Sequence, residues 1–246
     1  MPSNRDDFLT KLRRVRFSIE SVGLRRTIAD VLTHLLAYRP DRDDTFDRAF
    51  DTDTAGSVAP AELGIDDTLV REQAILYLPS PARVTRWMLD RLGIDHRTFS
   101  FVDLGCGKGR VLLVASEYPF HRIVGVEISA QLSETARGNV ERYRPSARKC
   151  WNVDVQAIDA TKVDFPDTDL LVHLYHPFEA AITSAVLSRL EASFRSKPRK
   201  VVVAYLLYAN AFESVEAVFA QFPWLKQRRY ERSVLGQYNW LVYSAE

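Results

Sequence analysis

The stretch FVDLGCGKGRVLLVASEYPFHRIVGV, residues 101–126, organises the fold predicted for this chain. It begins with an apolar run at 101–104 and continues into a glycine-rich turn at 105–109. Apolar residues at helical spacing follow over 110–118, and a second apolar run covers 123–126. The order strand, glycine turn, helix, strand predicts a right-handed βαβ unit if the two strands are parallel.

Glu127 closes the second apolar run. Its carboxylate, at the tip of the predicted strand, suits a ribose, because both ribose hydroxyls can donate to it. The glycines of the turn let the backbone fold tightly and let a ligand approach without Cβ atoms in the way. The turn and the acid together predict a site for a nucleoside cofactor.

The spacing of the glycines narrows the choice of cofactor. A dinucleotide fold has the pattern G-x-G-x-x-G, in which the third glycine permits close packing of the helix. Here that third position holds Arg110, and the pattern is G-x-G-x-G with Asp103 two residues before the first glycine. An NAD-dependent oxidoreductase is therefore disfavoured, and nicotinamide binding would be needed to revive it.

This pattern resembles motif I of the class I S-adenosylmethionine (SAM) methyltransferases, in which an acid near the strand end faces the methionine portion of the cationic cofactor. The form DLGCGKGR is most similar to a bacterial group of largely unassigned acceptor, with some likeness to the seven-β-strand protein-lysine methyltransferases. The resemblance covers residues 77–246 and implies SAM as the cofactor. It implies cofactor contacts from Asp103, Gly105, Cys106, Gly107, Gly109, Glu127 and Ile128.

Upstream, the sequence Tyr77-Leu78-Pro79-Ser80 is similar to the Y-x-P-[ST/A] element that precedes motif I in several lysine methyltransferases. That likeness implies that Tyr77 and Ser80 touch the methionine end of the cofactor. A packed tyrosine and a helix N-cap explain the residues equally well, because Ser80 followed by Pro81 is a good helix-start signal. The predicted helix runs to Leu92.

The ends of two later strands supply further predicted site residues. The third strand, 151–158, ends at Asp159-Ala160; in the family an acid and a small residue here contact the adenine, and a strand-end loop acid is the alternative. The fourth strand, 169–175, is followed at once by His176-Pro177-Phe178. Ligands of open α/β sheets bind outside the carboxyl ends of the strands, so this turn is predicted to lie beside the methyl group.

The turn after the fourth strand resembles the Asn-Pro-Pro-Phe and Asn-Pro-Phe turns of amine and amide N-methyltransferases. Here His176 replaces the asparagine and one proline is missing, which removes the usual inference for adenine or glutamine acceptors. His176, with Tyr175 beside it, is the predicted catalytic residue, since an ordinary histidine pKa of about 6.5 suits a general base. A histidine that only holds the turn is the alternative. His173, inside the strand, is interpreted as a satisfied core residue.

The remaining periodicities complete an α/β protein. Helices are predicted over 129–143, 179–195 and 211–222, a fifth strand over 199–208, and a hairpin from 226–234 and 238–243. The predicted fold is a Rossmann-like class I methyltransferase fold: a mostly parallel seven-stranded sheet with a C-terminal antiparallel hairpin, plus an N-terminal helical extension. The methyltransferase domain is predicted to span 77–246.

Residues 1–76 are predicted to form the N-terminal extension. Its basic segment 4–38 carries one continuous apolar helix face that includes Leu24 and Ile28. That face is interpreted as a stripe under a solvated helix, or as a substrate-facing cap or homodimer contact. The aspartate-rich segment 40–59 is predicted to be a loop or short helix whose acids face solvent or a basic substrate. Its phenylalanines suggest that it folds back over another part of the chain.

Bulk composition is that of an ordinary soluble globular protein, with 46% apolar and 26% charged residues. The net charge of +1 provides no global field that would recruit nucleic acid or an anionic membrane. The two cysteines, Cys106 and Cys150, form neither a disulfide framework nor a metal pattern. There is no apolar run of the ~20 residues that span a bilayer, and no signal-peptide core. A cytoplasmic protein is predicted.

The predicted function is transfer of the SAM methyl group to a nitrogen or oxygen nucleophile of a small molecule or of a peptide or protein side chain. Nucleic acid ranks lower as an acceptor, because no recognisable RNA-binding module is attached. The alternative is a catalytically silent SAM-binding regulator or partner protein, with a cofactor site but no acceptor chemistry.

Overall fold

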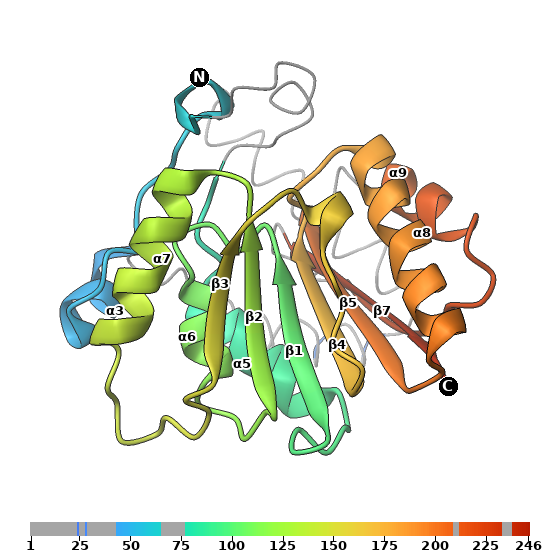
Figure 1. The fold of residues 1–246 in the computed structure, drawn as a ribbon, viewed down its shortest axis with the longest axis horizontal. Coiled ribbons are helices and arrows are strands. Elements are labelled where there is room, and N and C mark those ends of the chain that lie inside the picture. The colour runs from blue at the N-terminus through green and yellow to red at the C-terminus, as the bar shows by residue number, and fades with distance from the viewer. Residues whose placement is uncertain (1–23, 25–27, 29–42, 65–76, 209–211, 233–237) are drawn as a thin grey trace.

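The computed structural model of the chain describes residues 24, 28, 43–64, 77–208, 212–232 and 238–246. These residues form one seven-stranded sheet with helices on both faces (Figure 1). The N-terminal helices predicted within 4–38 lie outside the described residues, except for Leu24 and Ile28. Both of these are helical and about half exposed.

The sheet has the predicted topology. Its strands are β1 (Phe99–Leu104), β2 (Arg122–Glu127), β3 (Val153–Ala157), β4 (Asp169–Tyr175), β5 (Val201–Tyr208), β6 (Lys226–Arg232) and β7 (Tyr238–Ala245). They are ordered β3-β2-β1-β4-β5-β7-β6. Pairs among β1 to β5 are parallel, whereas β7 is antiparallel to both β5 and β6. The mostly parallel sheet with an antiparallel hairpin is thus confirmed.

Strand order reverses between β1 and β4. The chain builds β2 and β3 on one side of β1, then returns to place β4 and β5 on the other side. In such sheets the ligand crevice lies outside the carboxyl ends of the two strands at the reversal. Asp103 of β1 and His173 of β4 are register partners near that edge.

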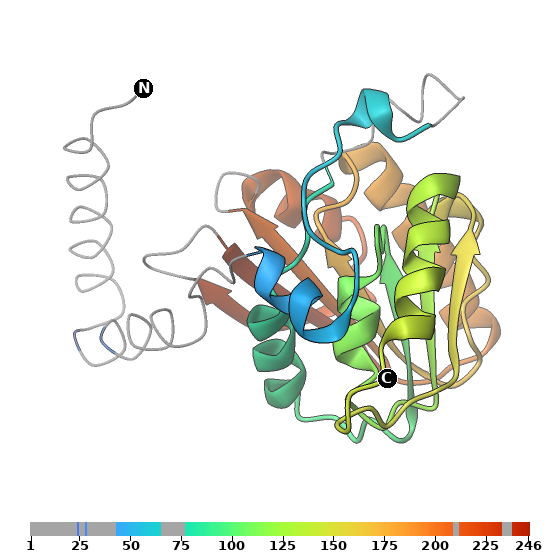
Figure 2. The ribbon, with the colours of Figure 1, turned by 90° about the vertical axis from the view of Figure 1, so that its left-hand side faces the viewer.

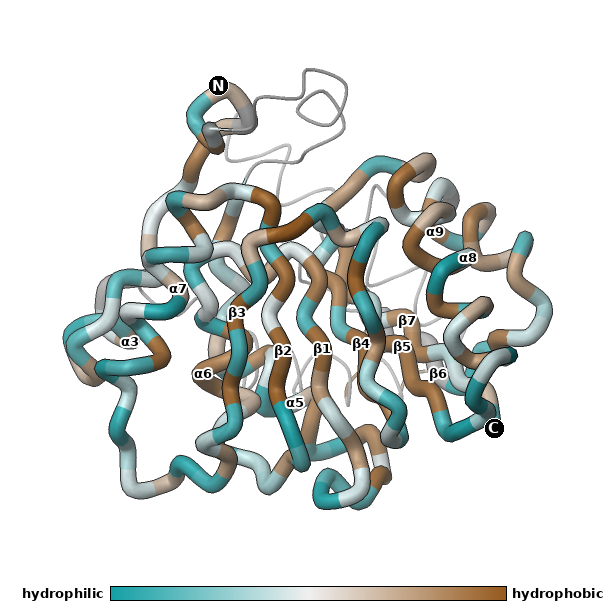
Figure 3. Tube along the Cα trace, in the orientation of Figure 1, coloured by the Kyte–Doolittle hydropathy of each residue, from teal (hydrophilic) through white to brown (hydrophobic). Residues whose placement is uncertain are grey.

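Two hydrophobic cores hold helices against the sheet. Helices α5 (Ala82–Arg91), α6 (Arg110–Ala115) and α7 (Ala130–Arg142) share one core, and α8 (Ala180–Ser196) and α9 (Phe212–Phe219) share the other. Every residue of β1 is buried because both faces are covered, and the hydrophobic residues follow the central strands (Figure 3). Among the described helices, none combines the length and hydrophobicity needed to cross a membrane.

The start of α5 differs from the prediction by one residue. The helix begins at Ala82, and Pro81 takes the N-cap position in an extended conformation with ψ 126°. The Pro81 carbonyl accepts from the backbone N–H groups of Val84 and Thr85. Ser80 is not the N-cap, because its buried hydroxyl pairs with the Thr85 hydroxyl at 3.2 Å instead.

Residues 43–64, here called the strap, contain helix α3 (Asp43–Phe50) and the 3₁₀ helix η1 (Pro60–Glu62). The strap crosses the α6–α7 side of the sheet domain (Figure 2). Phe46 is buried and stacks on Tyr143 with ring centroids 6.0 Å apart, and Phe50 meets the same ring at 4.9 Å. The aspartate-rich segment therefore folds back over the core, as its phenylalanines predicted. The predicted domain boundary at residue 77 remains a prediction.

Candidate functional site

The glycine turn, residues 105–109, joins β1 to α6 at the carboxyl edge of the sheet. Gly105 and Gly107 have φ angles of 75° and 53°, which side chains with a Cβ rarely adopt. The N–H groups of Gly105 and Cys106 both donate to the Val126 carbonyl, at 2.8 and 3.0 Å. The turn is therefore tied to the end of β2.

Glu127, the last residue of β2, lies beneath the turn with 7% of its surface exposed. Its two carboxylate oxygens accept from the N–H groups of Gly107 and Ser129, each at 2.9 Å. Burial raises the pKa of Glu127, as does the charge of Asp103, although the backbone donors lower it. Each oxygen can accept further hydrogen bonds, so the side chain fits the predicted ribose contact.

Two side chains of the protein pack directly onto the glycine turn. A Cβ built on Gly105 would lie 2.5 Å from Pro177 Cβ, and one on Gly107 would lie 2.1 Å from Tyr77 Cε2. Tyr77 is held there by a β-bridge to Val58 and by its hydroxyl, which donates to the strap. Glycine is thus required at both positions by the protein's own packing.

Gly107→Ala is expected to lower the free energy of unfolding by about 1–3 kcal/mol, the usual cost of placing a non-glycine residue in the left-handed region. Contact of the new methyl with Tyr77 should add to that cost. Urea unfolding would measure both effects. In a Tyr77→Ala background the contact is absent, so Gly107→Ala should be less destabilising there; an equal effect in both backgrounds would contradict the packing argument.

A small cavity, of about 20 Å³, lies between the glycine turn and residues 77–80. Of the predicted site residues, its lining includes Tyr77, Ser80, Asp103, Gly105, Cys106 and Tyr175. Arg110 and His173, which were not predicted as site residues, line it as well. The cavity has room for about one water molecule.

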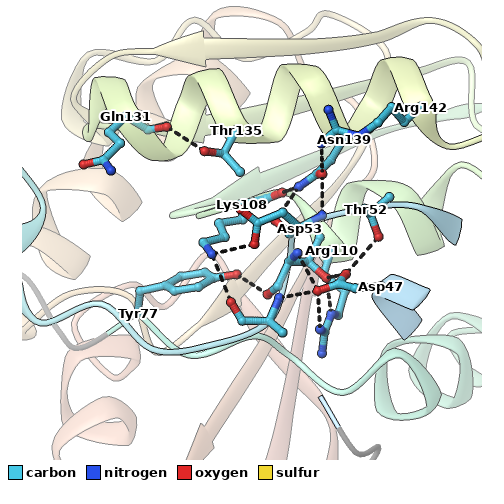
Figure 4. Close-up of polar contacts among 12 residues, drawn as sticks. Asp47, Thr52, Asp53, Tyr77, Lys108, Arg110, Gln131, Thr135, Asn139 and Arg142 are labelled. Atoms are coloured by element: carbon cyan, nitrogen blue, oxygen red, sulfur yellow. Dashed lines mark hydrogen bonds and ion pairs between the residues drawn. The ribbon is translucent and has the colours of Figure 1, made fainter. Parts of the chain in front are cut away.

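Asp47 of α3 anchors the strap (Figure 4). Its carboxylate accepts hydrogen bonds of 2.6–2.8 Å from the Thr52 hydroxyl, from both the N–H and the hydroxyl of Thr54, and from the Ala55 N–H. It also lies 3.8 Å from Arg110 Nη2. Burial by itself would raise the pKa of Asp47, but the hydrogen bonds from Thr54, Thr52 and Ala55 hold that pKa below its ordinary value.

Arg110 connects this anchor to the glycine turn. It opens α6, is only 2% exposed, and donates from Nε to the Thr54 hydroxyl at 2.6 Å. Its guanidinium carbon lies 5.3 Å from the centre of the Phe46 ring. At the position where a dinucleotide fold has its third glycine, this chain therefore has a buried arginine that binds the strap.

A second group of contacts fixes the strap to α7 (Figure 4). Lys108 Nζ lies 2.8 Å from Asp53 Oδ1 and donates to the Ala55 carbonyl at 3.0 Å. Asn139 donates to the carbonyls of Asp53 and Lys108 and accepts from the Asp53 N–H. The Asp47 side chain is 12% exposed and bound within the chain, so its predicted exposure to solvent is wrong. The Asp53 side chain is 64% exposed, as predicted for a solvated acid, while it also pairs with Lys108.

The other predicted cofactor residues lie on the same edge but outside the cavity lining. Asp159 caps η2 (Ala160–Lys162), where its Oδ1 accepts from the N–H and the hydroxyl of Thr161, each at 2.8 Å. Ala160 is buried, and Ile128 packs beside buried Leu132. Their cofactor contacts remain predictions.

His176 follows β4 in the left-handed region, with φ 38°. Asparagine and histidine are both enriched in that region, which explains why either residue can occupy the turn. His176 Nδ1 lies 3.1 Å from Tyr205 Oη. Burial lowers the pKa of His176, opposed in part by the charge of Glu179. His176 is not among the residues that line the cavity, whereas Tyr175 is.

His173 is a buried core residue, as interpreted, but only one of its two ring nitrogens has a hydrogen-bond partner in the residues that the structure describes. Its Nδ1 lies 2.6 Å from Asp103 Oδ1, whereas its Nε2 has no hydrogen-bond partner among the described residues. Strand periodicity marked the position as buried but contained no information about its partner in β1.

The Cys106 thiol is not activated as a nucleophile. Burial raises the pKa of the Cys106 thiol well above its ordinary value, and the charges of Glu127 and Asp103 raise it further. A protonated thiol is a poor nucleophile. Within the described part of the chain, no group of three or more His, Cys, Asp or Glu residues could hold a metal ion.

Comparisons with known proteins bear on the fold and on the kind of domain. Residues 101–197 match a family model described as a methyltransferase domain. A SAM-dependent methyltransferase from Aquifex aeolicus superposes with a TM-score of 0.53 at 16% identity, covering 76% of this chain and 98% of that one. A ribosomal protein L11 methylase from Lactobacillus delbrueckii subsp. bulgaricus superposes with a TM-score of 0.51 at 14% identity, covering 67% of this chain and 77% of that one. No curated protein sequence matches the chain significantly.

At these low sequence identities, the likeness to the solved structures shows that the fold is shared and no more. The matched domain model runs from β1 to the end of α8 and so contains the glycine turn, Glu127 and His176. Residues 101–197 thus match a methyltransferase domain, and the sheet around them has the class I fold. Its placement in a particular bacterial group remains a prediction.

Proposed function

We propose that the enzyme transfers the SAM methyl group to a nitrogen or oxygen nucleophile on a small molecule or on a peptide or protein side chain. SAM supplies an electrophilic methyl group on a sulfonium, so the protein contributes mainly by positioning the reactants. The acceptor would approach at the carboxyl edge of the sheet, where β1 and β4 diverge.

The charge pattern of the cavity carries this proposal. Asp103 and Arg110 line the same small space, next to the glycine turn. A carboxylate can accept from an ammonium group, and a guanidinium can pair with a carboxylate. The methionine end of SAM carries both of these groups, so the cavity supports binding of that end of the cofactor.

The size of the cavity implies a movement. Space for about one water molecule cannot take a methionine tail. Tyr77 and Pro177 cover the glycine turn, and Tyr77 is attached to the strap by a hydrogen bond to the Thr54 carbonyl of 2.8 Å. We therefore infer that residues 77–80 shift outward when SAM binds.

The acceptor side is assigned to the turn of His176, Pro177 and Phe178. This turn follows β4 and packs against Gly105. For His176 to act as a base at Nε2, its Nδ1 must carry the proton and donate it to the Tyr205 hydroxyl. The near-zero net charge of the chain favours an acceptor other than nucleic acid.

Glu127→Ala is expected to weaken SAM binding by about 1.5–3 kcal/mol, the range for hydrogen bonds to a charged group. Calorimetry would measure the change, with thermal unfolding as a check, because the N–H groups of Gly107 and Ser129 lose their acceptor. Glu134→Ala, on the exposed face of α7, is the matched control. An unchanged affinity in Glu127→Ala would overturn the ribose assignment.

The proposed reaction is tested by an unbiased search for the acceptor. SAM labelled in its methyl group would be incubated with extract fractions, and mass spectrometry would identify the labelled product. A small molecule or a methylated peptide side chain is the expected result. Label found in nucleic acid alone would contradict the proposed acceptor class.

A second candidate is a SAM-binding protein without acceptor chemistry. Packing of Tyr77 over Gly107 would suit a site that holds its cofactor and does not turn it over. Tight SAM binding with neither a labelled product nor slow formation of the demethylated cofactor would support this candidate over the enzyme.

A further inference from the structure

A buried acid–histidine pair lies where the strand order of the sheet reverses. Asp103 and His173 are register partners on adjacent parallel strands, and His173 Nδ1 lies 2.6 Å from Asp103 Oδ1. The exposed fraction is 2% for Asp103 and 0% for His173. This is a short distance for a hydrogen bond between nitrogen and oxygen.

The surroundings of the ring favour neutral histidine. His173 lies between Phe101 and Trp240, with ring centroids 6.0 and 5.7 Å away. A buried imidazolium needs a partner for each N–H, and Nε2 has no partner among the described residues. A neutral ring that donates from Nδ1 leaves the carboxylate of Asp103 with its full negative charge.

The identity of the residue that donates to Asp103 matters if the ligand is a cation. A hydrogen-bond donor stabilises the charged form of a buried carboxylate. A neutral imidazole stabilises the anion and adds no positive charge of its own. Asp103 can then attract a cation that enters the cavity lined by both residues.

We propose that His173 is a positioning residue for the methyl donor: it fixes the orientation of the Asp103 carboxylate for the cationic methionine end of SAM. This inference rests on the proposed function, because that function places the methionine end in the cavity. His173 is thereby given a role distinct from that of His176, which lies in the turn and bonds to Tyr205.

Three substitutions test the proposal. The amide nitrogen of Asn is close to the position of histidine Nδ1 and can still donate to Asp103. Gln places its amide farther out, and Leu has no donor. By calorimetry, His173→Asn should bind SAM within about threefold of the wild type, whereas His173→Leu and His173→Gln should bind at least about tenfold more weakly, or 1.4 kcal/mol.

A double-variant cycle separates positioning from packing. In an Asp103→Asn background there is no carboxylate to fix, so His173→Gln should change SAM affinity by less than about threefold. His96→Asn is the control for loss of a partly buried histidine, because His96 packs against Tyr118 and Phe120 and does not line the cavity. It should leave SAM affinity unchanged.

The outcomes are distinguishable. A folded Gln or Leu variant that binds SAM as tightly as the wild type would overturn this inference and leave the proposed function intact. An Asn variant as weak as the Leu variant would also overturn it, since the donor to Asp103 would then not be what matters. A wild-type protein that fails to bind SAM would overturn the proposed function and this inference together.

Discussion

Asp47→Ala is expected to lower the free energy of unfolding by about 3–5 kcal/mol, the range for removing one partner of a buried ion pair. Arg110 would remain buried but would lose the Asp47 carboxylate beside it. The N–H groups of Thr54 and Ala55 would also lose their shared acceptor. Urea denaturation at neutral pH measures the change.

The expected loss of stability depends on how deeply the ion pair is buried, and not on the distance between its charged atoms. Asp164 and Arg189 are closer, at 2.7 Å, but the Asp164 side chain is 97% exposed. Asp164→Ala should therefore change stability far less than Asp47→Ala, because solvent screens exposed pairs. The variant that combines Asp47→Ala with Arg110→Met removes both charges of the pair, so this variant should be more stable than Asp47→Ala alone. The opposite order would contradict the assignment of the ion pair.

The contribution of Asp47 has a defined pH dependence. Its pKa in the folded protein lies below the ordinary value of 3.8. An acid whose pKa is depressed by folding stabilises the protein above its unfolded pKa and loses that contribution as pH falls through its folded pKa. The stability difference between wild type and Asp47→Ala should therefore be constant near neutrality and shrink below about pH 4.

The sheet was predictable because its strands and turns have local signals. The stretch DLLVHLY, residues 169–175, is mostly apolar, and the predicted strand agrees with β4 at both ends. The glycine turn and the hairpin are local patterns of the same kind. The predicted third strand was three residues too long in all, because β3 is Val153–Ala157 and the flanking residues do not pair.

The contacts of the strap were not predictable, because they join residues far apart in the sequence. Thr54 and Arg110 are 56 positions apart, and Asp53 and Asn139 are 86 positions apart. An aspartate-rich segment resembles a solvated loop until its partners are known. The phenylalanines did carry a signal, since apolar side chains in an acidic segment require a surface to pack on.

The sequence predicted which residues lie at the strand ends of the site, but it did not predict which side chains pair with each other. The glycine turn, Asp103 and Tyr175 come together at the carboxyl edge because parallel strands end there. Pairing of Asp103 with His173 depends on the register of two strands that lie 70 residues apart. Hydrophobic periodicity does not show which residues face each other on two strands that are so far apart in the sequence.

His176→Asn is expected to bind SAM normally but to lose about 10²–10⁴ in rate if the imidazole accepts the acceptor's proton, the usual share of general base catalysis. A base works in its neutral form, so the wild-type rate should fall as pH drops through the histidine pKa. Burial places that pKa below the ordinary value of 6.5. The Asn variant should lack this acid limb.

Two comparisons make the test decisive. Tyr205→Phe keeps the His176 ring but removes the hydroxyl that lies 3.1 Å from Nδ1; this variant should be slower than the wild type yet retain the acid limb. If His176 only holds the turn, Asn should replace it well, because Asn also adopts the left-handed conformation found there. The rate would then change by less than about tenfold, near 1.4 kcal/mol, with the acid limb unaltered. That outcome would favour an acceptor amine that arrives already deprotonated, because such a nucleophile needs no base from the enzyme.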